Sequence, residues 1–226
     1  MFAVVILAAG ESRRMGQPKA LLPFPENFLS GNSRQNDDRP ATRAAGRANP
    51  APAKTNPKTF LCHLIDVTRH PRAGILRVVA GAHAEEIRAT AKLDADELVV
   101  NEEWQRGQLS SLQAAIRNLP QDATEGMLVC LVDHPLISER VIAQLMDAFE
   151  AHKNKIVIPT FRGRRGHPVI FSSALYAELL NAPADIGARA VVREHAGDVI
   201  EVPVEEEGVL LNLNDPESLQ RITNLK

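Results

Sequence analysis

The sequence predicts an α/β protein built around a mostly parallel sheet. Short apolar runs rich in β-branched residues recur along the 226-residue chain, and amphipathic helical patterns lie between them. This alternation is typical of βαβ units, whose strands are parallel. Aromatic residues make up only 4% of the chain, so its core must consist of Val, Ile, Leu and Ala. That composition favours an α/β architecture over an all-β one.

Five apolar runs are the predicted strands. The first covers residues 3–7 and stops at Ala-Ala-Gly, as expected of a strand that is buried on both faces. The other four runs cover residues 76–80, 98–100, 127–132 and 156–158.

Three helices are expected after these strands. In two of them apolar residues recur on one face: Leu112, Ile116 and Leu119 in the first, and Ile142, Leu145, Met146 and Phe149 in the second. Ser110 or Ser111 is expected to cap the first helix, and Ser138 the second. Asp215 can cap a third helix that begins at Pro216.

Residues 27–57 interrupt this pattern. They have no hydrophobic period, few large apolar residues, and many Asn, Arg, Ala and Pro residues. Such a stretch cannot bury enough surface to offset the entropy of ordering it. We therefore expect a single domain over residues 1–226 with a disordered insertion at 27–57. Its basic residues leave open a role over an anionic site.

Residues 156–171 are expected to form a hairpin-like excursion. Two apolar stretches flank the sequence Arg-Gly-Arg-Arg-Gly, and we expect Gly163 and Gly166 in its turns.

The bulk composition excludes several classes of protein. A formal net charge of −2 leaves no global basic field for nucleic acid. Cys62 and Cys130 have no zinc-site spacing, and both are expected to be buried thiols. The apolar run 2–9 is too short for a bilayer and lacks the basic start of a signal peptide. A cytoplasmic setting without membrane or nucleic-acid partners follows.

The loop after the first strand is the expected place for chemistry, because ligands of open α/β sheets bind beyond the carboxyl ends of the strands. Ala8, Ala9 and Gly10 let the backbone approach a ligand closely. Arg14 and Lys19 add positive charge, a combination that suits a polyphosphate. The spacing matches neither a P-loop nor G-x-G-x-x-G. On residue types alone, a solvated basic loop remains an alternative.

The same stretch resembles a family signature. Residues 7–23 read Leu-Ala-Ala-Gly-x-Ser-x-Arg-Met-Gly-x-x-Lys-x-Leu-Leu-Pro, which is similar to the signature of the MobA-like nucleotidyltransferases. Four later blocks resemble this family in the same order: NEEWQRGQLSSL at 101–112, LVDHPLI at 131–137, RRGHPVIF at 164–171 and NLNDPESL at 212–219. Within the family, Ala9-Gly10 looks most like the molybdenum cofactor cytidylyltransferases, because the guanylyltransferases usually have Gly-Gly there.

The resemblance implies a fold and a reaction. The fold would be a Rossmann-like three-layer sandwich of the nucleotide-diphospho-sugar transferase type, with a mixed, mostly parallel sheet. The reaction would move CMP from CTP to molybdopterin with release of pyrophosphate, and a molybdoenzyme or its chaperone would be a partner. Two alternatives remain: a transferase for another nucleotide or acceptor, such as GTP or a sugar phosphate, and a non-catalytic molybdopterin-delivery protein.

The resemblance also implies catalytic residues. Arg14 and Lys19 would hold the triphosphate and offset charge on the leaving group. Asp133 would hold Mg²⁺, with Asn212 as a second ligand. Asn212 stands where the cytidylyltransferases usually have Asp, and Val132 stands where the family usually has Gly. If 209–211 is a strand ending beside that of Asp133, both side chains can face one ion.

Further residues are assigned to binding. His167 would contact the phosphate of the acceptor, although a structural role for this histidine remains open. His134 receives no catalytic role. The expected nucleotide pocket consists of Leu7, Ala8, Ala9, Gly10, Ser12, Arg14, Lys19, Gly81, Asn101, Gly107, Ser110 and Ser111, in which the two serines could equally be helix caps.

Overall fold

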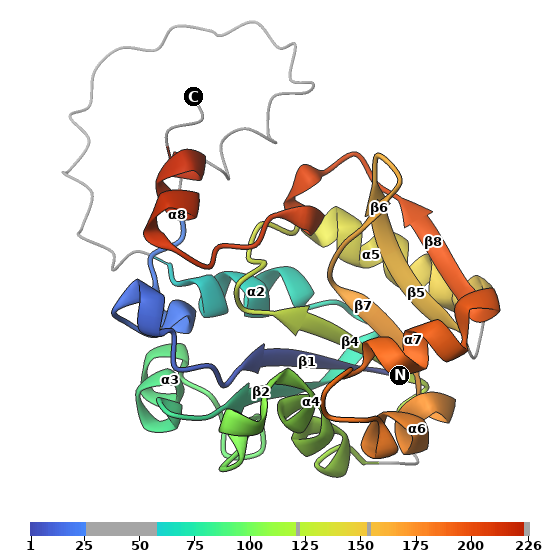
Figure 1. Cartoon of the computed structure of the whole chain (residues 1–226), viewed down its shortest axis with the longest axis horizontal. Helices are drawn as coiled ribbons and strands as arrows, with labels where there is room; N and C mark the ends of the chain where they lie inside the picture. The colour runs from blue at the N-terminus through green and yellow to red at the C-terminus, as the bar shows by residue number, and fades with distance from the viewer. Residues whose placement is uncertain (26–57, 121–122, 153–154, 224–226) are drawn as a thin grey trace, which may run out of the picture.

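A mixed sheet forms the centre of the protein (Figure 1). The structure, a computed structural model, describes residues 1–25, 58–120, 123–152 and 155–223. Within them the strand order is β3-β2-β1-β4-β7-β5-β6, and β8 pairs with β5. The strands are β1 (Phe2–Ala8), β2 (Ala73–Ala80), β3 (Leu98–Val100), β4 (Gly126–Leu131), β5 (Ile156–Phe161), β6 (Arg164–Arg165), β7 (Val169–Ser172) and β8 (Val199–Pro203).

Most strand pairs are parallel, as the sequence predicted. β1 runs parallel to β2 and β4, β2 to β3, and β5 to β8. The exceptions are β7, which is antiparallel to β4 and β5, and β6, which is antiparallel to β5. Leu7 pairs with Val79 on one side and with Leu131 on the other, so β1, β2 and β4 end at the same edge of the sheet.

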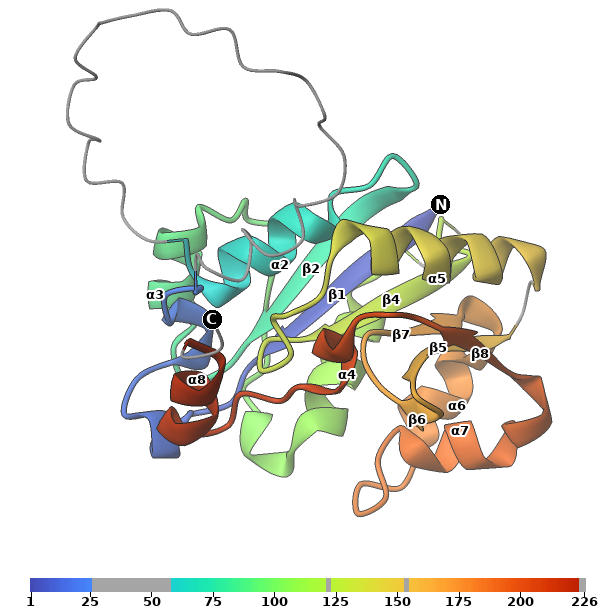
Figure 2. The ribbon, with the colours of Figure 1, turned by 90° about the horizontal axis from the view of Figure 1, so that it is seen from above.

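Helices cover both faces of this sheet and complete three layers (Figure 2). The helices α2 (Phe60–Thr68), α3 (Ala84–Ala91) and α5 (Glu139–Ala151) pack on one face. The helices α4 (Gln108–Arg117), α6 (Tyr176–Asn181) and α7 (Arg189–Glu194) lie on the other. Alternate residues of β1 serve the two cores, since Val4 and Ile6 belong to one and Val5 and Leu7 to the other.

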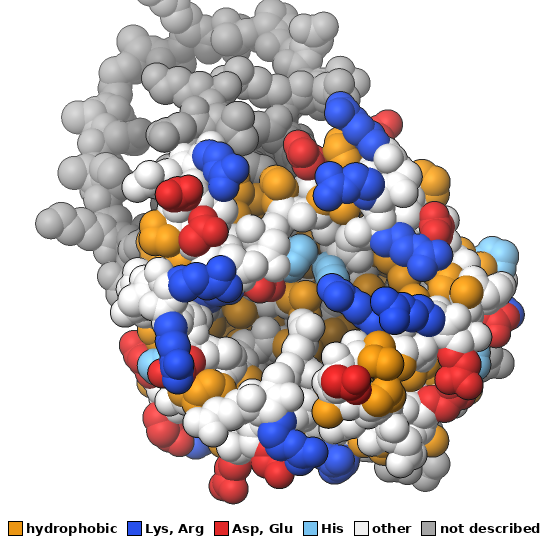
Figure 3. Space-filling model, viewed as in Figure 1, with side chains coloured by type: hydrophobic (Ala, Val, Ile, Leu, Met, Phe, Trp, Pro, Cys, Tyr) orange, Lys and Arg blue, Asp and Glu red, His pale blue; other side chains and the backbone are white. Residues whose placement is uncertain are grey.

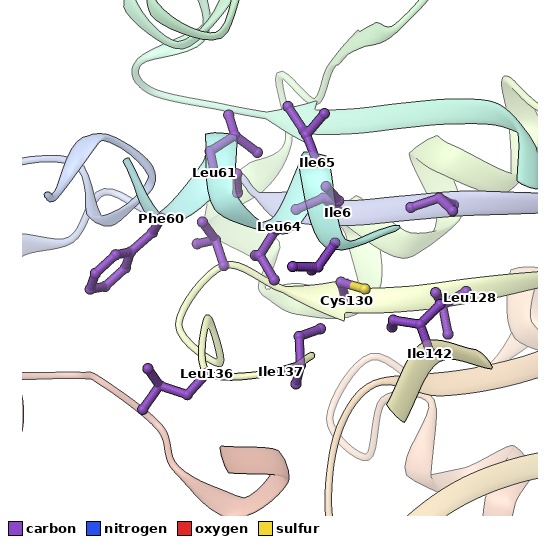
Figure 4. Close-up of a cluster of buried hydrophobic side chains, with 14 of the residues drawn as sticks. Ile6, Phe60, Leu61, Leu64, Ile65, Leu128, Cys130, Leu136, Ile137 and Ile142 are labelled. Carbon is purple, nitrogen blue, oxygen red and sulfur yellow. The ribbon is translucent and has the colours of Figure 1, made fainter. Parts of the chain in front are cut away.

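The core beneath α2 shows how tightly one layer packs on the sheet (Figure 4). Leu64 and Ile6 are fully buried there beside Ile142 of α5. Burial contributes roughly 1.5–3 kcal/mol for each such side chain. Cys130 lies in the same core, and burial raises the pKa of its thiol. Cys62 is only partly buried, which corrects the expectation that both thiols are buried.

All five predicted strands are present. Three of them extend beyond the apolar runs, β3 matches its run, and β4 begins and ends one residue earlier than predicted. Ser138 caps α5 by accepting a hydrogen bond from the Val141 N–H, as predicted. Asp215 likewise accepts from the Ser218 N–H at the start of α8 (Pro216–Thr223).

The predicted caps of α4 are wrong, because this helix begins at Gln108, directly after Gly107. Ser110 and Ser111 therefore lie inside the first turns of α4, where their hydroxyl groups make other contacts. The apolar run 209–211 is also not a strand, because residues Glu207–Leu210 form a 3₁₀ turn.

The predicted hairpin is present, with one difference in its turns. Arg162 and Gly163 both have positive φ, at 51° and 75°, and connect β5 to β6. Such a two-residue turn matches the twist of the strands that it joins. Gly166 makes no turn; a Cβ there would collide with the Val209 carbonyl, so glycine permits the C-terminal segment to pass close by.

Two further sequence predictions concern the insertion at residues 27–57 and the absence of a membrane span. The predicted insertion at 27–57 lies outside the described residues. None of the helices in the described part of the chain has the length and apolar composition that a transmembrane span requires.

His63 on α2 generates a prediction about pH. Its ring stacks on Phe24 with 3.8 Å between ring centroids, and burial lowers its pKa to about 4 from 6.5. Between these two pH values the unfolded chain binds more protons than the folded protein, so the free energy of unfolding falls as the pH falls through this window. The contribution of His63 is on the order of 3 kcal/mol.

We therefore expect His63→Phe to lose less stability than the wild type between pH 6.5 and pH 4. Urea unfolding at several pH values measures this difference, with exposed His152→Gln as a control. Equal losses in His63→Phe and wild type would contradict the assignment.

Candidate active site

The loop after β1 is folded back on itself at the edge of the sheet. Ser12 and Gly16 both have positive φ, and a 3₁₀ turn, Arg13–Met15, lies between them. The Ser12 hydroxyl accepts a hydrogen bond from the Lys19 N–H at 3.0 Å. This closure fixes the loop, and both Arg14 and Lys19 line the adjacent cleft.

Three distant segments meet at Asp133, just beyond the end of β4. Lys19 Nζ lies 3.5 Å from Asp133 Oδ2 and also donates a hydrogen bond to Asn214 Oδ1. Asn212 Nδ2 donates to Asp133 Oδ2 at 3.2 Å. The Leu213 N–H donates to the Asp133 carbonyl at 2.7 Å, so the backbone of the tail is bound directly to the β4 loop.

The tail reaches Asp133 by crossing the β4 loop at very short range. A Cβ on Gly208 would collide with the Leu136 carbonyl, so glycine is required at this crossing. The His167 N–H donates to the Val209 carbonyl at 2.9 Å and holds the other side of the crossing. Asn212 thus faces Asp133 as expected, but a 3₁₀ turn and not a strand delivers it.

Two histidines lie against this cluster. The rings of His134 and His167 have centroids 4.8 Å apart. Burial lowers the pKa of both, in His167 to about 4, so both are neutral at pH 7. His134 Nε2 lies 3.2 Å from Asn212 Nδ2 and accepts its hydrogen bond, which orients the Asn212 amide.

The loop between β3 and α4 is organised by a buried asparagine. Asn101 Nδ2 donates to the hydroxyl groups of Ser110 and Ser111 at 2.9 and 3.0 Å. Asn101 Oδ1 accepts from the Glu103 N–H at 3.0 Å. These bonds hold the 3₁₀ turn Trp104–Arg106, whose residues line the cleft.

Gly81, at the end of β2, lies directly beneath this turn. A Cβ there would come within 2.5 Å of the Ala9 carbonyl oxygen and 2.7 Å of Trp104 Cγ. Gly81 therefore lets the Trp104 turn pack on the loop after β1. Trp104 is the one tryptophan of the chain.

These elements surround a cleft of about 1150 Å³. Its floor is the apolar face of the sheet, including Val129, Leu131 and Val169. Figure 3 shows Lys and Arg side chains on both sides of this hollow and histidine side chains at its centre. The cations among the described lining residues are Arg13, Arg14, Lys19, Arg106, Arg165, Arg189 and Arg193, against Asp133 and Asp185 as the acids.

The structure separates the predicted pocket residues into two groups. Those that line the cleft are Leu7, Ala9, Gly10, Ser12, Arg14, Lys19, Gly107 and Ser111, together with Asp133, His167 and Asn212. Those that do not are Ala8, Gly81, Asn101 and Ser110. Ala8 belongs to the opposite core, and the other three support the Trp104 turn.

Several lining residues were not predicted from sequence. Trp104 lies inside the block NEEWQRGQLSSL at 101–112, and its place in that block was the only indication from the sequence that it belongs to the site. Arg165 lies in the predicted hairpin and in another of these blocks, RRGHPVIF at 164–171, but was assigned no role. Arg189 and Arg193 are four residues apart on α7, a spacing that solvated helix faces also show.

The donor set at Asp133 suits a hard cation. Asp133 offers carboxylate oxygens, and no described residue donates to Asn212 Oδ1, which leaves that oxygen for an ion. In the described residues no cluster of three or more His, Cys, Asp or Glu side chains could enclose a metal. A Mg²⁺ ion fits two such oxygens, because it takes its remaining ligands from water and phosphates.

Comparison with known proteins gives one family and several relatives. A family model described as MobA-like NTP transferase domain matches residues 4–35 and 40–199. The purine catabolism protein PucB of Bacillus subtilis is 25% identical over 96% of this chain and 94% of its own length. The nicotine blue oxidoreductase of Paenarthrobacter nicotinovorans is 26% identical, over 96% and 94%. A probable molybdenum cofactor guanylyltransferase of Mycobacterium avium is 26% identical, over 99% and 96%.

Solved structures confirm the predicted type of fold. Rv0371c from Mycobacterium tuberculosis H37Rv superposes with a TM-score of 0.71 and 26% identity, covering 98% of this chain and 96% of its own. CMP:2-keto-3-deoxy-manno-octonic acid synthetase, solved with CTP, has a TM-score of 0.63 and 11% identity, over 99% and 97%. The sheet and its two helical layers are therefore those of the nucleotide-diphospho-sugar transferases.

Gly81 offers a test of this geometry that needs no knowledge of the reaction. We expect Gly81→Ala to push Trp104 and the β1 loop apart, because the added Cβ meets a backbone oxygen that cannot rotate away. Displacing a binding wall by about 1 Å can cost up to roughly a hundredfold. Nucleotide affinity, measured through the fluorescence of Trp104, should fall by at least about tenfold.

Gly197→Ala is the matched control, because no atom lies within 4 Å of a Cβ at that position. Wild-type nucleotide affinity in a folded Gly81→Ala variant would show that the Trp104 turn does not shape the binding site.

Proposed function

The chain belongs to the MobA-like NTP transferase family, and on that premise we propose that it transfers CMP from CTP to the phosphate of a molybdopterin-type acceptor. The family fixes the coarser activity, that of a nucleotidyltransferase acting on a nucleoside triphosphate. The sequence Ala9-Gly10 in the loop after β1 supports CTP as the nucleotide. The curated guanylyltransferase relative supports a molybdenum cofactor as the acceptor. The reaction would take place in the cytoplasm, and a molybdoenzyme or its chaperone would receive the product.

The observation that carries this proposal is the meeting of Lys19, Asp133 and Asn212 beside the β1 loop. A cation and two oxygen donors at one point suit a reaction in which negative charge builds up on phosphate oxygens. A non-catalytic carrier would need no such arrangement in the middle of its cleft.

In the proposed reaction an oxygen of the acceptor phosphate attacks the α-phosphorus of CTP. The bond from that phosphorus to the bridging oxygen breaks, and pyrophosphate leaves with the electron pair. Lys19 and Arg14 stabilise the charge on the departing phosphates, while backbone groups at Ala9 and Gly10 allow close approach. The apolar floor excludes water, which strengthens these interactions.

Asp133 and Asn212 would hold Mg²⁺ in this scheme. When bound, the ion offsets charge on the α-phosphate and orients it for attack. Lys19 lies within ion-pair distance of Asp133, so its charge would act beside the same phosphates. Rv0371c, the structural relative at 26% identity, has also been crystallised in complex with manganese.

A guanylyltransferase is the second candidate, because one curated relative carries that name. Pyrophosphate release with molybdopterin as acceptor, measured separately with CTP, GTP, ATP and UTP, distinguishes the candidates. We expect CTP to be preferred. A GTP preference or equal use of both nucleotides would contradict the choice of base, and no release with any nucleotide would contradict the proposed reaction.

Asp133 and Asn212 should contribute unequally to the metal site. Asp133 supplies formal charge, whereas Asn212 supplies a dipole. We expect Asp133→Ala to lower the rate at least roughly a hundredfold, the scale for losing one preorganised electrostatic group. Asn212→Ala should cost less, and Asn212→Asp should retain activity or tighten Mg²⁺ binding. The three variants are compared by measuring the reaction rate as a function of Mg²⁺ concentration.

Far-ultraviolet circular dichroism checks that these variants fold. A folded Asp133→Ala enzyme with near-normal activity would place the metal site elsewhere.

A further inference from the structure

Two arginines of α7 line the far side of the cleft. They are Arg189 and Arg193, one helical turn apart. Within the described residues neither guanidinium group forms a hydrogen bond or an ion pair. Arg165 of β6 lines the same side, and its Nε is 2.8 Å from Glu201 Oε1.

Most other cations of the cleft are neutralised nearby. Arg13 pairs with Glu11, Arg106 with Glu103, and Lys19 with Asp133. Arg14 forms no ion pair in the described part of the chain, but its charge helps to lower the pKa of Asp215, so an acid lies near it. Among the described lining residues, the cations without an ion pair are therefore Arg14, beside Asp215, and the α7 pair.

This arrangement costs stability unless an anion is bound. Like charges four residues apart on a helix repel each other by roughly 0.2–0.5 kcal/mol. Asp185 is the one acidic lining residue on this side in the described part of the chain, and it forms no ion pair with either arginine. Two free guanidinium groups in a concave site are typical of an anion subsite.

The surroundings of the pair are apolar. Val192 lies between the two arginines in sequence and also lines the cleft. Ile186, at the rim, is 42% exposed, which is unusual for a large hydrophobic residue of this protein. Ile158 and Phe171 form the floor below. A ligand here therefore combines an anionic group with an apolar body.

Arg165 lies across the sheet from the loop after β1. β4 and β7 lie between β1 and β5. Neighbouring strands are about 4.8 Å apart, so three spacings separate the β1 loop from the β5–β6 hairpin that carries Arg165 by roughly 14 Å. Arg189 lies close enough to His167 for its charge to contribute to the lowered pKa of that histidine.

We propose that Arg189 and Arg193 bind a second anionic group of the acceptor, on the α7 side of the cleft. The pair would select acceptors that carry two separate negative groups joined by an apolar body. This proposal rests on the proposed function only for the identification of the ligand as an acceptor. The anion subsite itself is argued from the residues that line the cleft.

The test uses inorganic phosphate as the probe and the Arg189→Ala, Arg193→Ala double variant. Saturating CTP with Mg²⁺ occupies the β1 side, and phosphate is then titrated at constant ionic strength while the melting temperature is recorded. Arg164→Ala is the matched control, because Arg164 is exposed on the same hairpin as Arg165 and does not line the cleft.

We expect phosphate to raise the melting temperature of wild type and Arg164→Ala equally, and to leave the double variant unchanged. CTP affinity, followed by Trp104 fluorescence, should change less than twofold in all three proteins. With molybdopterin as the acceptor, the double variant should raise the KM for the acceptor at least about tenfold. Arg193→Lys in the wild-type background should be milder than Arg193→Ala.

An equal phosphate response in the double variant would overturn the proposal. A large loss of CTP affinity would also overturn it, because the pair would then belong to the nucleotide site. Failure of CTP to bind or react would instead contradict the proposed function alone, since the phosphate titration can be repeated without nucleotide.

Discussion

The hydrogen bond from the Leu213 N–H to the Asp133 carbonyl is the contact on which the site depends. It anchors the C-terminal segment across the β4 loop at a crossing so close that only glycine fits at position 208. Asn212 and Asn214 then lie on either side of the anchored residue, one against Asp133 and the other against Lys19. Without this contact the loop after β1 would keep its shape, but Lys19 would lose Asn214, one of the two groups that orient it.

Electrostatics divide the cleft into two functional sides. The protein carries a formal net charge of −2, yet the described lining residues are mostly cationic where they are charged. On the β1 side the ammonium group of Lys19 contacts both Asp133 and Asn214, so the position of its charge is fixed. On the α7 side Arg189 and Arg193 line the cleft above an apolar floor, and neither guanidinium group forms an ion pair with another described residue. A low local dielectric makes both arrangements more effective than they would be in water.

The shape of the cleft is controlled by residues that support its walls. Asn101 is buried, and its side-chain amide donates hydrogen bonds that hold the loop before α4. Gly81 allows the Trp104 turn to pack against the loop after β1. His134 orients Asn212 through a neutral ring, since burial lowers its pKa. These supporting groups fix the walls of the site, so that the groups lining it meet a ligand without prior rearrangement.

The sequence by itself determined the features that depend on short-range patterns. The apolar run of β1, the helical period of α5 and the caps at Ser138 and Asp215 each involve residues a few positions apart, and each was predicted. The cap of α4 was missed because Gly107 starts that helix earlier than the serines suggested. Only the tertiary structure decided how distant residues meet. A 3₁₀ turn, and not a strand, brings Asn212 to Asp133, a pairing that the family resemblance had implied. Asn101 lies beneath the Trp104 turn, and the arginines of α7 line the cleft. The physical reason is that strand and helix periods specify which face of an element is buried, whereas the crossing of the tail and the position of α7 are set by packing between segments far apart in the chain.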